Sequence, residues 1–191
     1  MNSFSDSRIL IQRILGGDTQ AFQAIIQDYQ RLVSQIIFRM VPNKVEVEDL
    51  CQDVFMKVYQ NLASFQFQAK LSTWIARIAY NTAVNYLKKK KVPLFADLSP
   101  EGRSIEAFSN EGAPADEAVV QHDLTARVEA EIQKLPVRFK TILTLYHLQE
   151  MSYAEIGKIM GLPDGTVKSY LFRARRMLRE RLLAKYDQEV L

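Results

Sequence analysis

The sequence predicts an all-α protein made of two helical modules joined by a flexible acidic linker, and three observations carry that prediction. Apolar residues make up 48% of the 191 residues, while only 7 Gly and 6 Pro interrupt the chain. Apolar residues also recur at helical spacing on both sides of a central stretch. That stretch, residues 93–122, is rich in Pro, Gly and acids and shows no sustained period. We therefore expect domains over residues 1–92 and 123–191, with a linker over 93–122.

Charge divides along the same boundaries. Residues 1–92 hold 12 Lys and Arg against 7 Asp and Glu, residues 93–122 hold 1 against 6, and residues 123–191 hold 12 against 9. Two basic blocks that flank an acidic one fit a polyanionic partner such as nucleic acid. Ordinary solvated faces would give the same counts, so charge alone does not decide.

Composition also sets aside several classes of protein. Cys51 is the one cysteine and His122 and His147 are isolated, so we expect neither a disulfide within the chain nor a metal site or cofactor. The polar N-terminus and the lack of an apolar run of about 20 residues indicate a cytoplasmic protein. The sequence has no Gly-rich phosphate-binding loop and no nucleophile–His pairing, so we expect no enzymatic activity.

The first module reads as four helices. Residues 7–40 form two of them, broken at Gly16, Gly17 and Asp18, and residues 46–63 form the third. A loop over 64–71 precedes the fourth helix, which runs to about Lys91 with Ser72 or Thr73 as its N-cap.

The helix over 46–63 carries a cluster of polar side chains off its apolar stripe. Asp49, Gln52 and Asp53 lie together on that face. A solvated face is the default interpretation. An acidic face in an otherwise basic module is also suited to docking another protein.

The helix over 72–91 carries aromatic, amide and cationic side chains on one face. That face holds Trp74, Arg77, Asn81, Asn85 and Lys88, and Phe65 and Phe67 come just before it. Aromatic rings stack on unpaired bases, amides read base edges and cations hold phosphates, so the set suits single-stranded or melting DNA. The alternative is that Trp74 simply packs against a neighbouring helix.

The second module reads as helices over 123–134, 136–149, 153–160 and 165–185, and the last two form a helix-turn-helix. Ser152 and Glu155 make a capping box, and Gly161 ends the helix at a positive φ. Gly157 in mid-helix indicates a close helix–helix contact, and Asp164 can cap the next helix.

The helix over 165–185 is the expected recognition helix. Its N-terminal part should enter the major groove, where side chains read base edges or hold phosphates. The candidate contacts are Thr166, Lys168, Ser169, Phe172, Arg173 and Arg176. The alternative is a helical hairpin with a solvated basic face.

Five segments in order resemble the extracytoplasmic-function (ECF) group of the sigma-70 family of RNA polymerase sigma factors. They are 49–55 (Asp-Leu-Cys-Gln-Asp-Val-Phe), 71–81 (Leu-Ser-Thr-Trp-Ile-Ala-Arg-Ile-Ala-Tyr-Asn), 135–139 (Leu-Pro-Val-Arg-Phe), 151–157 (Met-Ser-Tyr-Ala-Glu-Ile-Gly) and 165–169 (Gly-Thr-Val-Lys-Ser). The resemblance covers nearly the whole chain apart from the linker.

The resemblance implies a transcription initiation factor that binds core polymerase and directs it to promoters with −35 and −10 elements. Residues 1–92 look like sigma region 2: Asp49, Gln52 and Asp53 match the docking face for the β′ clamp helices. Trp74 matches an aromatic that wedges at the melting −10 element, and the loop 64–71 and Asn81 fall where the family captures a flipped base. Residues 123–191 look like sigma region 4, which reads the −35 element and meets the β flap.

The resemblance also implies an anti-sigma partner and a monomer when the chain is free. Two positions depart from the family pattern. Tyr170 stands where many relatives carry Arg, and Leu71 stands where an aromatic is common.

Two other functions fit parts of the sequence. An ordinary transcription regulator would use residues 1–92 as a sensor or dimerisation domain and would bind its operator without polymerase. An enzyme acting on nucleic acid could place a metal on Asp49 and Asp53, but no third ligand is evident nearby.

Overall fold

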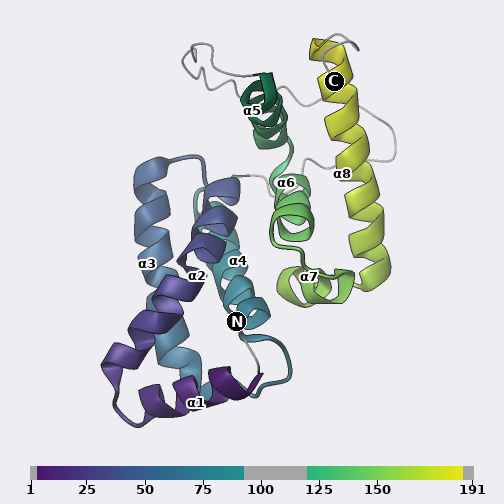
Figure 1. Cartoon of the computed structure of the whole chain (residues 1–191). Coiled ribbons are helices and arrows are strands. Elements are labelled where there is room, and N and C mark those ends of the chain that lie inside the picture. The colour runs from purple at the N-terminus through teal and green to yellow at the C-terminus, as the bar shows by residue number, and fades with distance from the viewer. Residues whose placement is uncertain (1–3, 93–119, 187–191) are drawn as a thin grey trace.

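The computed structural model of the chain describes residues 4–92 and 120–186, and every secondary-structure element in these ranges is helical (Figure 1). The all-α prediction is therefore confirmed. We call residues 4–92 the N-terminal module and residues 120–186 the C-terminal module. The expected linker falls mainly on residues 93–119, which lie outside the described residues.

The N-terminal module consists of four helices and one short 3₁₀ turn. They are α1 (Phe4–Leu15), α2 (Thr19–Met40), α3 (Lys44–Asn61), the turn Leu62–Ser64 and α4 (Leu71–Lys89). The Asp18 side chain accepts a hydrogen bond from the Ala21 amide and caps α2, and Asn43 caps α3 in the same way. The apolar stripes of α2, α3 and α4 pack together around fully buried residues such as Ile25, Val54 and Ile75.

The C-terminal module consists of α5 (Val120–Gln133), α6 (Val137–Leu143), a π-helical turn over Thr144–Leu148, α7 (Tyr153–Met160) and α8 (Asp164–Lys185). Helix α6 packs on α8, and α7 crosses the start of α8. Ile142, Leu145, Ile156 and Leu171 are at most 1% exposed and form the centre of this second core.

Two predicted helix caps are wrong. Helix α4 begins after Lys70 and α8 after Pro163, and neither start has a side-chain cap; Ser72, Thr73 and Asp164 instead lie inside the first turns. The extended backbone of Lys70 and Pro163 turns the chain into each helix, and their carbonyls accept the first helical bonds.

The two modules are packed against each other. Helix α4 contacts α7, and α2 contacts α6 and the π-helical turn (Figure 1). Arg39 on α2 is buried and forms an ion pair with Glu129 on α5, and Gln149 donates a hydrogen bond to Gln35. The sequence did not determine this orientation. Among the described helices, none combines the length and the apolar character that a bilayer-spanning segment needs.

Candidate nucleic-acid interface

The polar face predicted on α3 is exposed to solvent. Asp49, Gln52 and Asp53 point outward, while Leu50, Val54 and Val58 on the opposite side are buried. The face borders an apolar groove between α2 and α3, which Gln52 also lines. The apolar residues of this groove are Phe22, Ile26, Val47, Cys51, Phe55, Met56 and Tyr59. A carboxylate face beside such a groove can bind an amphipathic helix through both charge and apolar contact.

Three aromatic side chains before and within α4 form one cluster. The Phe65 ring lies 4.7 Å from that of Phe67 and 5.2 Å from that of Trp74, measured between centroids. Phe65 is buried, whereas Phe67 and Trp74 are half-buried. The cluster gives the loop over residues 65–70 a fixed shape, although few backbone hydrogen bonds hold it.

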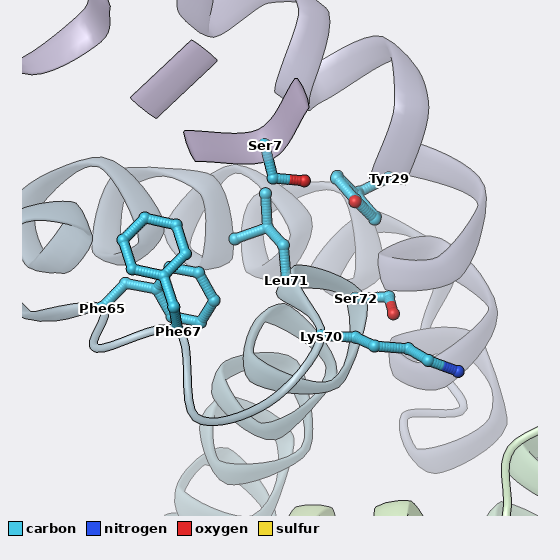
Figure 2. Close-up of a pocket in the computed structure, with 7 residues that line it drawn as sticks. All are labelled: Ser7, Tyr29, Phe65, Phe67, Lys70, Leu71 and Ser72. Atoms are coloured by element: carbon cyan, nitrogen blue, oxygen red, sulfur yellow. The ribbon is translucent and has the colours of Figure 1, made fainter. Parts of the chain in front are cut away.

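A cavity of about 90 Å³ opens beside this cluster (Figure 2). Its walls come from three parts of the N-terminal module: α1, α2, and the loop with the start of α4. The lining residues are Ser7, Tyr29, Phe65, Phe67, Lys70, Leu71 and Ser72. Aromatic and aliphatic walls with hydroxyl and ammonium groups at the edge suit a flat heteroaromatic ring with polar edges. Leu71 is buried in the core and contributes one of the aliphatic walls.

A second hollow, of about 340 Å³, lies on the other side of the aromatic cluster. It brings together Phe65, Trp74 and Arg77 of the predicted set with Gln66, Gln68 and Lys158. Trp74 packs on Phe65 of the loop and also lines this hollow. Farther along α4, Asn81, Asn85 and Lys88 are exposed on the same side of the helix.

The helix-turn-helix forms as the sequence predicted. Ser152 and Glu155 make the capping box, with the Ser152 amide donating to Glu155 at 2.9 Å, and Gly161 ends α7 at φ +67°. Gly157 faces the turn between the helices: a Cβ there would lie 2.7 Å from the carbonyl oxygen of Leu162. The contact that required a glycine is thus with the backbone of the turn.

Helix α8 presents an exposed polar face opposite its buried residues. Val167, Leu171 and Ala174 face the core, and Thr166 is half-buried. The exposed members of the predicted set are Lys168, Ser169, Phe172, Arg173 and Arg176. The Phe172 ring is 68% exposed and the Ser169 hydroxyl donates to the Thr166 carbonyl at 2.9 Å. A cationic helix face with one protruding ring matches a major-groove reader.

A buried carboxylate that no sequence pattern predicted lies behind α8. Glu131 on α5 is 2% exposed and accepts hydrogen bonds from Lys134 at 2.8 Å and from Arg181 and Lys185 at 3.2 Å. Burial alone would raise the pKa of the Glu131 carboxyl, but the hydrogen bonds and charges of the three cations outweigh it and hold that pKa below its ordinary value. The cluster ties the C-terminal half of α8 to α5.

Glu155 joins the helix-turn-helix to the N-terminal module. Besides its capping role, its carboxylate pairs with Lys70 at 3.0 Å and accepts from the Thr73 hydroxyl at 3.4 Å. Burial would raise the pKa of this carboxyl, yet hydrogen bonds from Ser152 and Lys70 more than offset burial and lower it. Lys70 and Thr73 were not predicted as site residues because their partner lies more than 80 positions away.

Comparison with known proteins finds two family models that match in order along the chain. The sigma-70 region 2 model matches residues 25–92, and the sigma-70 region 4 model matches residues 125–178. The curated relative SigW, an ECF RNA polymerase sigma factor of Bacillus subtilis (strain 168), is 35% identical over 176 residues, which cover 90% of this chain and 94% of the relative. The ECF RNA polymerase sigma-E factor of Escherichia coli (strain K12) is 34% identical over 179 residues, covering 90% and 91%.

Two solved structures share the fold. The structure of CnrH in complex with the cytosolic domain of CnrY gives a TM-score of 0.67 at 21% identity and covers 94% of this chain and 98% of the matched one. The sigma factor RpoE in complex with the anti-sigma factor NepR from Bartonella quintana gives 0.64 at 21% identity, covering 88% and 100%. The likeness therefore extends over both modules.

Proposed function

Because this chain belongs to the ECF group of the sigma-70 family of RNA polymerase sigma factors, we propose that it binds core RNA polymerase, directs it to promoters with −35 and −10 elements and helps to melt the −10 element. Its place of action is then the cytoplasm, where polymerase and promoters are. The relatives are initiation factors, so we assign the chemistry of RNA synthesis to the polymerase and none of it to this chain.

One observation carries the proposal: a single chain carries three different surfaces that suit the three partners met during initiation. The acidic face of α3 comes first, the aromatic and amide side of α4 comes next, and the cationic face of α8 is last. A DNA-binding regulator needs only the third surface. The first two are explained by a polymerase partner and by an unpaired strand.

We assign the surfaces as follows. Asp49, Gln52 and Asp53, with the apolar groove beside them, bind the β′ clamp helices. The aromatic cluster and the exposed side of α4 hold the melted −10 strand by stacking and phosphate contacts. Helix α8 reads the −35 element in the major groove, and the C-terminal module meets the β flap.

A regulatory partner is part of the proposal. The two structures of related fold are complexes: CnrH with the cytosolic domain of CnrY, and the sigma factor RpoE with the anti-sigma factor NepR. We propose that an anti-sigma factor likewise restrains this chain, and that the free chain is a monomer.

The experiment is transcription reconstituted from core polymerase and the purified full-length chain on fragmented DNA of the source genome, with start sites mapped by sequencing. We expect initiation only when both are present, downstream of shared −35 and −10 sequences. Asp53→Arg should abolish co-purification with core and initiation, because it reverses a charge on the docking face.

The matched control is Gln23→Arg, which adds the same side chain to an exposed site on α2 that does not line the groove. It should leave core binding unchanged. Undiminished core binding by Asp53→Arg would refute the docking assignment. Tight sequence-specific DNA binding by the chain without polymerase would instead favour an ordinary regulator.

A further inference from the structure

Helix α1 supplies a wall of the cavity shown in Figure 2. The Ser7 side chain lines the cavity from α1, opposite Leu71 and the aromatic rings of the loop. Ser7 is half-buried, and its hydroxyl can both donate and accept a hydrogen bond. The sequence offered no reason to connect residue 7 with the loop over 65–70.

The neighbouring residue of α1 contacts the loop directly. The Arg8 guanidinium lies over the ring of Phe67, 5.0 Å from its centroid. Phe67 has a φ of +57°, a conformation that a bulky residue adopts only where its surroundings hold it. Contacts of the Phe67 ring with Arg8 and with Phe65 provide that support.

Helix α1 is held firmly enough to act as a wall. Ile11 and Ile14 are buried in the core of the N-terminal module, and α1 packs on α2 and on the 3₁₀ turn before the loop. Ser7 and Arg8 thus keep their place relative to the loop.

These two residues also lie outside the matched family segment. The region 2 model begins at residue 25, whereas Tyr29 and residues 65–72 of the cavity fall within it. The cavity is therefore built from residues inside the match to the family model and from a wall that precedes the start of that match.

We propose that α1 is a specificity-determining wall of the pocket that captures one unstacked base of the −10 strand. The inference rests on the proposed function. The base stacks on Phe67, the Ser7 hydroxyl meets its polar edge, and Arg8 holds Phe67 in place while its exposed charge attracts the adjoining phosphate. Ser7 determines which base the pocket prefers, and Arg8 mainly increases the affinity for the strand.

The test uses holoenzyme made from core polymerase and the full-length chain. The probe is a pool of single-stranded DNA with ten randomised positions, which is selected on the wild-type holoenzyme and sequenced. The enriched strand is then synthesised with each of the four bases at every position, and affinities are measured by competition. The variants are Ser7→Ala, Arg8→Ala and, as a control, Arg13→Ala, which removes the same charge from the same helix but away from the cavity.

We expect Ser7→Ala to change the preference at one position by roughly three- to tenfold, with other positions unaffected. Arg8→Ala should weaken binding of every strand by a similar factor and lower its salt dependence. Thermal unfolding of the variants distinguishes these effects from loss of α1, since a structural defect would lower the unfolding temperature of the variant.

The outcomes separate the two proposals. If wild-type holoenzyme enriches no strand, the proposed capture of the −10 element fails and this inference fails with it. If wild type enriches a strand but Ser7→Ala and Arg8→Ala match Arg13→Ala at every position, α1 has no part in specificity, while the proposed function stands.

Discussion

The Glu131 carboxylate on α5 lies buried between three cationic side chains. Lys134, Arg181 and Lys185 are each 37–51% exposed, so they keep part of their hydration while Glu131 has lost almost all of its own. Loss of the three cations would therefore destabilise the buried carboxylate more than loss of the carboxylate would destabilise the cations. Its removal should loosen the C-terminal half of α8 rather than unfold the core.

We expect Glu131→Gln to lower the free energy of unfolding by about 1–3 kcal/mol at pH 7, because neutral hydrogen bonds replace charge-assisted ones. The carboxyl has a folded-state pKa below its ordinary 4.5, so its stabilisation is present above that pH and is lost as the pH falls through the folded pKa. Urea unfolding of both proteins from pH 7 to pH 3 measures the difference.

The difference between wild type and Glu131→Gln should therefore shrink on acidification below pH 4.5. The control is Glu180→Gln, which removes an exposed pair with Arg176 at 2.8 Å on the same helix and should change stability by less than about 0.5 kcal/mol. A constant difference at every pH would show that the charge of Glu131 is not what stabilises α8.

At the scale of the element, α8 carries cationic side chains that we expect to contact different parts of the DNA. Lys168 lies in the first turns, where a recognition helix approaches base edges, and Arg176 lies two turns later. Arg176 is already paired with Glu180, so binding a phosphate exchanges one exposed partner for another. The two cations should therefore affect DNA binding in different ways.

We expect Lys168→Ala to relax sequence preference in the −35 element, with a cost of about 1–3 kcal/mol on the preferred site. Arg176→Ala should weaken all sequences alike and reduce the slope of affinity against salt by about one charge. Holoenzyme binding to a panel of −35 variants at several salt concentrations checks both. The reverse pattern would mean that α8 enters the groove in another register.

The helices show which elements the sequence could predict. Periodic apolar stripes and the Gly161 stop placed α2, α3, α7 and α8 within a few residues of their observed bounds, because both signals are local. The cap predictions at the starts of α4 and α8 failed because an available Ser, Thr or Asp is not used when the preceding residue supplies the turn. Glu131, Ser7 and the Lys70–Glu155 pair escaped prediction because each depends on a partner distant in sequence.

At the scale of the whole molecule, the packing of the modules conflicts with promoter binding. The −35 and −10 elements are about 25 base pairs apart, which is about 85 Å of duplex. Lys70 and Glu155, which belong to the proposed readers of the two elements, are 3.0 Å apart. The proposed function therefore requires the modules to separate when the holoenzyme binds a promoter.

We expect Glu129→Gln to shift the chain towards separated modules, because it leaves the buried Arg39 without its ion-pair partner. Energy transfer between dyes on cysteines at the exposed positions 68 and 158, which line one hollow between the two modules, reports the separation in a Cys51→Ser background. Transfer should be high in the wild-type chain, lower in Glu129→Gln and low in both once core is added. Glu180→Gln serves as the control within α8.

The shift should also raise the apparent affinity for core, since a chain that must open before binding loses affinity in proportion to its closed fraction. Equal transfer efficiency in Glu129→Gln and wild type would show that apolar contacts alone hold the modules together.

The Lys70–Glu155 pair finally links promoter occupancy to the ionic composition of the cell. Lys70 is 65% exposed in this pair and Glu155 is 19% exposed, so a rise in internal potassium, as during osmotic upshift, screens the pair in part and favours open molecules. The same rise weakens the hold of cations on DNA phosphates. The two responses oppose each other, so we expect occupancy to fall less steeply with potassium than the phosphate contacts alone would dictate.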